Sequence, residues 1–213
     1  MARTPKPSGR KKLPDKGRPL RRRRRVDHRE KRRRFLIVCE GTRTEPNYFR
    51  RFKGSAIDVE VVGIGRDPLA VIEKARELNN EEQEKGIPYD EVWVVFDKNG
   101  VPAEQFNRAI HSAKQAGFHP AYSNQAFELW YVLHFEYLNV AIPRRQYQKR
   151  LDKLLGRRYR KNDPSLYDVL LPKQGTALRN AKRLLASYPQ HNPAQDDPCT
   201  TVHLLVEALN RAT

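Results

Sequence analysis

The chain has 213 residues, a formal net charge of +17 and a hydrophobic content of only 38%. This composition predicts one folded domain with a polar extension. The longest apolar runs, such as residues 35–39, have five residues. A membrane-spanning helix is therefore excluded, because crossing a bilayer takes roughly 20 apolar residues.

Residues 1–33 form a strongly basic extension. Residues 1–34 hold 17 Lys or Arg and three acids, so the rest of the chain has a net charge of only +3. The extension also has four prolines and almost no apolar residues. Such a segment cannot bury enough apolar surface to offset the entropy lost on ordering, so we expect a disordered tail. Five consecutive arginines are expected to neutralise nucleic-acid phosphates: Arg21, Arg22, Arg23, Arg24 and Arg25. A solubilising extension, a ribosome-associated tract and a membrane-surface tract are the alternatives.

Two features bear on the compartment. No secretory signal is expected, because further arginine rather than an apolar segment follows the basic residues. Cys39 and Cys199 lie far apart in the sequence, and Cys39 falls in an expected buried strand. This spacing indicates neither a zinc site nor a disulfide framework, so the expected location is the cytoplasm.

From Phe35 onward, the hydrophobic pattern alternates between strand and helix. Thr44 and Asp67 are the expected N-caps of the first two helices, and Gly117 is expected to end the third. Pro120 lies in the fourth strand and cannot donate to a ladder, so this strand is expected at an edge. The expected strands cover residues 35–39, 57–65, 89–97 and 118–123.

The remainder of the chain is predicted to be helical. The expected helices cover residues 126–135, 144–155, 176–187 and 200–211, and the expected loops cover residues 156–175 and 188–199. Strands that alternate with helices predict a parallel sheet with helices on both faces. The expected fold class is therefore α/β, with a folded domain at residues 34–213.

Two acids stand directly at the ends of expected strands. Glu40 follows the first strand and Asp97 ends the third. Ligands bind outside the carboxyl ends of parallel strands, so both side chains are expected at one edge of the sheet. Gly41 would let the backbone turn tightly beneath an incoming phosphate. Mg²⁺ or Mn²⁺ is the expected cofactor, since Mg²⁺ combines one or two carboxylates with water and phosphate oxygens. Either acid alone could equally be a turn residue.

Four blocks of sequence carry a resemblance: IVCEGTRTEPNYF, VWVVFDKNG, SNQAFELWYVLHF and TTVHLLVEAL. Over about residues 33–210 the chain resembles the RloB-like family, whose core resembles a TOPRIM domain. The resemblance implies a cytoplasmic prokaryotic protein that is linked to phage defence or abortive infection and is often encoded beside an ATPase partner. It also implies metal-dependent chemistry at Glu40 and Asp97, because TOPRIM domains place a Glu after the first strand and a DxD after the third.

The chain departs from that DxD pattern at Asn99. An amide oxygen can ligate Mg²⁺ but adds no charge, so the ion would be held more weakly. Glu45 and Glu128 are the acids that could compensate. Glu128 lies in an otherwise apolar helix, where an unpaired carboxylate is costly to bury. It is either a metal or substrate group or a helix-start acid favoured by the macrodipole.

Basic residues between 144 and 183 alternate with Tyr147, Tyr159 and Tyr167. Such a mixture can bind single-stranded nucleic acid by stacking and neutralisation, although solvated helix faces explain at least half of these residues. Four other side chains are interpreted as structural: Trp93, Trp130, His134 and His203.

The leading hypothesis is a Mg²⁺-dependent nuclease that cleaves RNA or DNA in phage defence. The candidate catalytic residues are Glu40, Asp97 and Glu128. The candidate metal ligands are Glu40, Asp97 and Asn99. Arg43 and Lys98 are further candidates for contacting nucleic acid. One alternative is a non-catalytic nucleic-acid-binding or sensing subunit, and another is a scaffold for the ATPase partner.

Overall fold

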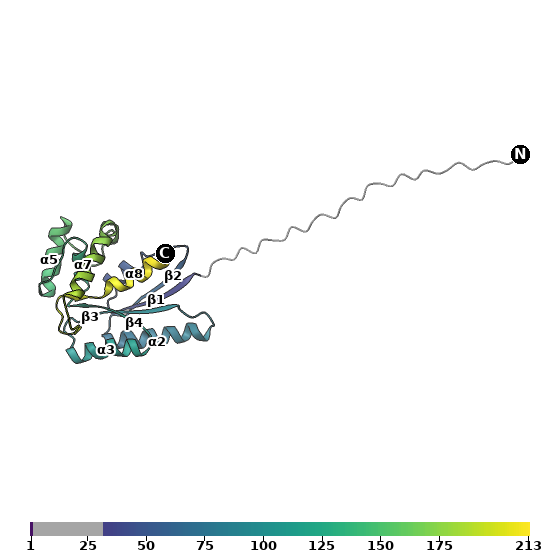
Figure 1. Ribbon diagram of the computed structural model, residues 1–213, viewed down its shortest axis with the longest axis horizontal. Helices are drawn as coiled ribbons and strands as arrows, with labels where there is room; N and C mark the ends of the chain where they lie inside the picture. The colour runs from purple at the N-terminus through teal and green to yellow at the C-terminus, as the bar shows by residue number, and fades with distance from the viewer. Residues whose placement is uncertain (2–31) are drawn as a thin grey trace. The chain divides into compact units, whose positions relative to one another are not determined.

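A computed structural model describes Met1 and residues 32–213 (Figure 1). Its centre is a five-stranded sheet with the strand order β2-β1-β3-β4-β5. The strands are β1 (Arg33–Cys39), β2 (Ile57–Gly63), β3 (Glu91–Asp97), β4 (His119–Asn124) and β5 (Cys199–Thr200). Strands β1 to β4 pair in parallel, and β5 is antiparallel to β4. The predicted α/β fold with a mostly parallel sheet is confirmed.

Helices cover both faces of the sheet. Helices α2 and α3 lie on one face, and α5, α7 and α8 lie on the other (Figure 1). The helices are α1 (Thr44–Phe49), α2 (Pro68–Glu84), α3 (Ala103–Gln115), α4 (Glu128–Leu133), α5 (Arg144–Leu155), α6 (Leu166–Leu170), α7 (Gln174–Ala186) and α8 (Val202–Ala212), with a 3-10 turn, η1 (Leu171–Lys173), between α6 and α7.

The apolar run of β1 explains this two-sided packing. Phe35 and Ile37 join the core beneath α4, α7 and α8, whereas Leu36 and Val38 join the core beneath α2 and α3. Successive side chains of a strand point to opposite faces, so a strand covered on both faces must be apolar at every position. All four of these residues have no solvent exposure.

Two predicted helix starts have different outcomes. Asp67 caps α2 as expected, because its Oδ1 accepts hydrogen bonds from the backbone N–H groups of Leu69 (3.1 Å) and Ala70 (3.3 Å). Thr44 is not a cap: it is the first residue of α1, and the capping position falls on Arg43, which makes no side-chain capping bond.

Two other expectations are corrected. Strand β4 is not an edge strand, because β5 pairs with it opposite Ser123 and Asn124. Pro120 is tolerated since this pairing does not extend to its position. The expected loop at residues 156–175 contains α6 and η1. The apolar pair Leu166 and Leu170, four residues apart and both buried, stabilises this short helical stretch.

Residues 2–31 of the predicted disordered tail, which include the arginines from Arg21 to Arg25, lie outside the described residues. Arg33, which the sequence assigned to the tail, is the first residue of β1 and pairs with Glu91 at 2.6 Å. Arg34 pairs with Glu82 at 2.7 Å. None of the helices in the described part of the chain is long and apolar enough to cross a membrane.

Candidate functional site

The carboxyl ends of β1 and β3 bring Glu40 and Asp97 together. Cys39 is paired with Val95 in the parallel register, so the residues that follow each strand lie side by side. The backbone N–H of Asp97 donates to Glu40 Oε2 at 3.0 Å. The two acids therefore share one edge of the sheet because of strand register.

A pocket of about 480 Å³ lies at this edge. Besides Glu40 and Asp97, it receives Glu45 from α1 and Glu128 from the start of α4. Arg43, a residue expected to contact nucleic acid, also lines it. Sequence reasoning did not assign four other charged residues of the lining to the site: Arg66, Asp67, Arg144 and Lys161.

Glu128 is almost completely buried, with 1% of its surface exposed. Its Oε1 lies 3.5 Å from Lys161 Nζ and accepts a hydrogen bond from the Tyr159 hydroxyl at 3.5 Å. Both partners come from the segment between α5 and α6, which folds over the start of α4. These contacts offset part of the cost of burying the carboxylate. Glu128 is therefore both the first residue of α4 and a pocket residue.

The side chain of Glu45 occupies the space that a side chain at position 41 would need, so Gly41 allows this packing. A Cβ atom added to Gly41 would lie 2.1 Å from Glu45 Oε2. The absence of a side chain at position 41 thus lets the Glu45 carboxylate approach the backbone beside Glu40. Glu45 itself is 6% exposed, so its carboxylate is largely removed from water. Close packing of α1 on the turn after β1 therefore brings the carboxylate of Glu45 into the pocket.

Burial and repulsion by neighbouring acids raise the pKa values of Glu40, Glu45 and Asp97. Burial raises the pKa of Glu45 to about 7, with further contributions from Glu128 and Glu40 and opposition from Lys161. Burial also raises the pKa of Asp97 well above its usual range, and Glu45, Glu128 and Glu40 raise it further. Glu40 has a raised pKa through burial, which the Asp97 N–H and Arg144 partly oppose. The pocket therefore favours a bound positive charge.

Asn99 and Lys98 do not line this pocket. Asn99 is exposed in a tight turn, in which the Val101 N–H donates to the Lys98 carbonyl at 2.8 Å. Gly100 adopts a left-handed φ of 73° in the same turn. The backbone reverses directly after Asp97, so the structure does not bring Asn99 to the acids.

The residues interpreted as structural lie away from the pocket. Trp93 and Trp130 are buried in the core. The Nδ1 of His134 lies 2.9 Å from the Trp130 carbonyl, and burial lowers the pKa of His134 to about 4. His203 is buried on α8, and burial lowers its pKa. None of the four lines the pocket.

The predicted stacking of bases on tyrosines is wrong for Tyr147 and Tyr159. Tyr147 is fully buried and Tyr159 is 7% exposed. Both side chains pack into the core on the α4 side of the sheet, because their positions on α5 and the following segment face inward. Tyr167 is only partly buried.

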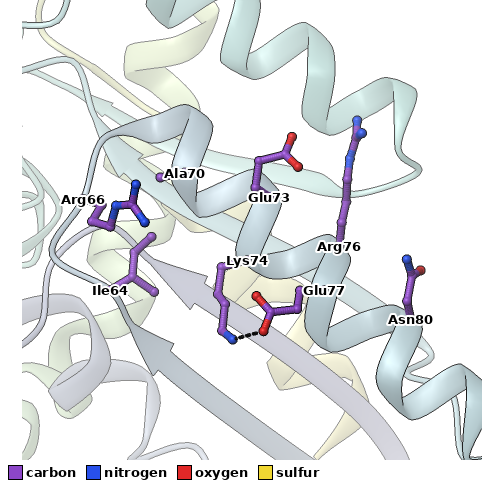
Figure 2. Close-up of a pocket in the computed structure, with 8 residues that line it drawn as sticks. All are labelled: Ile64, Arg66, Ala70, Glu73, Lys74, Arg76, Glu77 and Asn80. Atoms are coloured by element: carbon purple, nitrogen blue, oxygen red, sulfur yellow. Dashed lines mark hydrogen bonds and ion pairs between the residues drawn. The ribbon is translucent and has the colours of Figure 1, made fainter.

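A second hollow, about 590 Å³ in volume, lies along the outer side of α2 (Figure 2). Lys74 and Glu77 pair with each other there at 2.6 Å, so their charges are already balanced. The hollow has no buried acid among its lining residues. Its larger volume thus does not make it the better candidate for catalysis.

Comparison with known proteins identifies the family. The family model described as RloB-like protein matches residues 35–209. A search of curated proteins and a search of solved structures each found no match. The matched region contains all five acids that line the pocket and every strand except the first two residues of β1. The chain belongs to the RloB-like protein family.

Proposed function

We propose that this protein is a Mg²⁺-dependent nuclease and that the pocket at the carboxyl ends of β1 and β3 is its active site. The observation that carries the proposal is the convergence of four carboxylates from separate elements: Glu40, Glu45, Asp97 and Glu128. Burial raises the pKa values of Glu40, Glu45 and Asp97, and repulsion by neighbouring acids raises them further. Such an arrangement is costly in a merely structural turn and typical of a functional site.

The donor set fits magnesium. All four acids offer oxygen, and neither Cys nor His lines the pocket, so a hard cation such as Mg²⁺ or Mn²⁺ is favoured over zinc. Glu40, Asp97 and Glu128 would hold the ion, and Glu45 would supply the charge that Asn99 does not. When bound, the ion would polarise the scissile phosphate and stabilise the charge that develops on it.

The remaining pocket residues suit phosphate binding and proton transfer. Arg43, Arg144 and Lys161 line the same pocket as the acids and would orient the phosphate by charge-assisted hydrogen bonds. Glu45 has a pKa of about 7, so it can accept a proton from the attacking water near neutral pH. Glu45 is thus the proposed general base.

The surface beside the pocket favours a nucleic-acid polymer as substrate. Residues 144–161 hold nine Lys or Arg and one acid, whereas the rest of residues 35–213 holds 16 Lys or Arg and 21 acids. The first and last residues of this basic segment, Arg144 and Lys161, line the pocket. Its exposed basic residues are Arg145, Lys149, Lys153, Arg157, Arg158, Arg160 and Lys161. A strand bound along this surface would lead its phosphates to the acids.

The family relationship supports the biological setting of the proposal. The resemblance implies phage defence or abortive infection in the cytoplasm, with an ATPase partner. The alternative is a non-catalytic subunit that binds or senses nucleic acid, in which the acids hold a metal only structurally.

The test is cleavage of end-labelled single-stranded DNA, single-stranded RNA, duplex DNA and tRNA by the purified full chain with Mg²⁺, Mn²⁺ or EDTA. We expect metal-dependent cleavage that Glu40→Gln and Asp97→Asn abolish while binding remains. Glu104→Gln is the matched control, because Glu104 is an exposed acid in the first turn of α3. Binding without cleavage of any substrate would favour the sensing subunit.

A further inference from the structure

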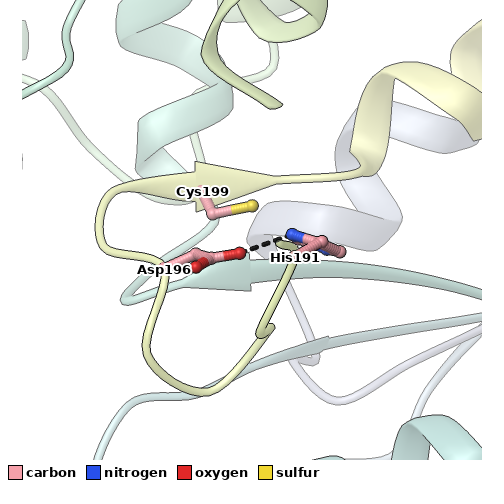
Figure 3. Close-up of side chains that lie close together, drawn as sticks. All are labelled: His191, Asp196 and Cys199. Carbon is pink, nitrogen blue, oxygen red and sulfur yellow. Dashed lines mark ion pairs between the residues drawn. The ribbon is translucent and has the colours of Figure 1, made fainter. Parts of the chain in front are cut away.

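A second group of chemically reactive side chains lies in the segment between α7 and β5 (Figure 3). His191, Asp196 and Cys199 each direct one donor atom into a region where all three atoms lie within 4.8 Å of one another. His191 Nδ1 and Asp196 Oδ2 are 2.5 Å apart. None of the three residues lines the candidate active site. This cluster is therefore independent of the proposed nuclease chemistry.

Burial makes the cluster unusual for a surface loop. Asp196 is 6% exposed and Cys199 is fully buried, whereas His191 is exposed and leaves the cluster open to solvent. Among the described residues, the Cys199 thiol has no hydrogen-bond partner. Asp196 is held in place because its Oδ2 accepts from the Asn192 N–H at 2.9 Å and its carbonyl accepts from Asn124 Nδ2 at 2.8 Å.

Tyr122 fixes the imidazole of His191 from the other side. The Tyr122 hydroxyl oxygen lies 2.5 Å from His191 Nε2, and the two rings stack at an interplanar angle of 15°. When Nε2–H donates to this oxygen, Nδ1 presents its lone pair towards Asp196 and Cys199. A lone pair and a carboxylate at 2.5 Å repel each other, so in the metal-free chain a proton on Nδ1 lies between them as a hydrogen bond. A metal ion would replace this proton, and the two ligand atoms would then separate to about 3.3 Å, the distance between ligands of a tetrahedral ion.

We propose that His191, Asp196 and Cys199 bind a Zn²⁺ ion and that Tyr122 positions His191 for this role. Zinc is bound in proteins by thiolate, imidazole and carboxylate, whereas Mg²⁺ takes oxygen ligands. A ligating histidine commonly donates its other ring N–H to an oxygen acceptor, the position that Tyr122 occupies here. The sequence did not predict a zinc site because only the spacing between Cys39 and Cys199 was considered. The ligands proposed here follow a His-x4-Asp-x2-Cys pattern, which contains a single cysteine.

The ion would tie an irregular segment to the sheet. Residues 187–198 contain neither helix nor strand, and Tyr122 and Cys199 belong to the neighbouring strands β4 and β5. A zinc ion at this place would join the segment to the end of the sheet and stabilise the folded state, because the unfolded chain does not present the same site.

The test uses the full chain after treatment with EDTA, titrated with Co²⁺ as a spectroscopic substitute and then with Zn²⁺. We expect a near-ultraviolet absorption band from cobalt bound to thiolate that saturates at one Co²⁺ per chain, displacement of this cobalt by Zn²⁺ and a rise in melting temperature. The band should disappear in Cys199→Ser, and His191→Gln should weaken affinity by about tenfold or more. Tyr122→Phe should keep the band and weaken affinity by about tenfold.

Two control variants separate this site from other metal binding. Cys39→Ala removes the other thiol of the chain and should keep the band. Glu40→Gln alters the candidate active site and should also keep the cobalt–thiolate band. Circular dichroism checks that each variant folds, and His191→Gln is the safer variant because His191 is exposed. The proposal is overturned if the chain binds neither ion, or if the band persists in both Cys199→Ser and His191→Gln.

Discussion

The backbone N–H of Asp97 donates a hydrogen bond to the carboxylate of Glu40, with 3.0 Å between nitrogen and Oε2. This bond joins the ends of two neighbouring parallel strands, and it fixes the Glu40 carboxylate at the rim of the pocket. It also partly opposes the rise in pKa that burial gives Glu40. Glu40 is therefore held in place by the backbone while its remaining oxygen is free of this bond and available to a cation.

Glu40→Gln should abolish metal-dependent cleavage. The amide keeps the shape of the side chain and its acceptor oxygen for the Asp97 N–H, so the free energy of unfolding should change little. Removing the charge should lower the cleavage rate by about a hundredfold or more. Single-turnover cleavage assays and thermal unfolding measure the two effects. A folded Glu40→Gln protein with the original cleavage rate would exclude the proposed catalytic role of Glu40.

The contribution of Glu45 to the stability of the metal-free protein should fall as pH rises from 4.5 to about 7, whereas buried His134, whose pKa is lowered to about 4, contributes with the opposite sign. Folded Glu45 keeps its proton up to a pKa of about 7, whereas the unfolded carboxyl releases its proton near its ordinary value of 4.5. Folded Glu45 thus binds more protons than unfolded Glu45 in this window, and its contribution lowers the free energy of unfolding by up to about 1.4 kcal/mol per pH unit. Urea unfolding of the unaltered chain and of Glu45→Gln at several pH values measures this contribution as the difference between the two slopes.

Glu45→Gln and added Mg²⁺ should each reduce the contribution of Glu45 to the slope. The amide cannot ionise, and its neutrality also removes one of the charges that raise the pKa of Asp97. Bound Mg²⁺ favours the ionised acids and stabilises the folded state at neutral pH. Glu77→Gln is a suitable control, because Glu77 pairs with Lys74 on the outer side of α2. An identical slope in Glu45→Gln and the unaltered chain would contradict the assignment.

Asn99→Asp should leave Mg²⁺ affinity nearly unchanged, whereas Glu128→Gln should weaken it. The sequence pattern alone predicts tighter binding for Asn99→Asp, because the change restores the second acid of a DxD. In the structure, Asn99 is exposed in the turn after β3, and Glu128 lines the pocket. Isothermal titration calorimetry with Mg²⁺ compares the two variants. A clear gain in affinity for Asn99→Asp would show that position 99 reaches the metal.

Gly41→Ala should weaken Mg²⁺ binding at the candidate active site while destabilising the fold only slightly. The added Cβ would meet the carboxylate of Glu45 at 2.1 Å, and this flexible group can move away. We expect weaker Mg²⁺ binding with a small change in melting temperature. Gly63→Ala is the informative comparison, because its Cβ would meet the backbone carbonyl of Gly41 at 2.5 Å. That variant should destabilise the protein by about 1–3 kcal/mol.

The basic surface and the N-terminal arginines should contribute separately to nucleic-acid binding. Deleting residues 2–31 keeps Arg33 and Arg34, whose ion pairs belong to the folded part. Replacing Arg157, Arg158 and Arg160 by Ser should flatten the plot of log K against log salt by about 2, since each phosphate contact contributes about 0.7–0.9. Fluorescence anisotropy at several salt concentrations measures the slope. If both changes leave the slope unchanged, neither region contacts the phosphates.

The order of strands and helices could be predicted from the sequence because it depends on short-range periodicity. Residues 35–39 are apolar at every position, which indicated a strand covered on both faces. The position of Glu40 and Asp97 after two such strands indicated a common edge, since parallel strands end together. These inferences need only the local pattern and the geometry of a parallel sheet.

The rest of the site depends on how distant segments pack, and no local pattern encodes it. Glu45 enters the pocket because Gly41 leaves room for it, and Lys161 reaches Glu128 because the segment after α5 folds over α4. Asn99 lies only two positions after Asp97 in the sequence, but the turn at Gly100 carries Asn99 away from the acids of the pocket. The tertiary structure decided these positions because burial and charge interactions act between side chains that are neighbours in space and not in sequence.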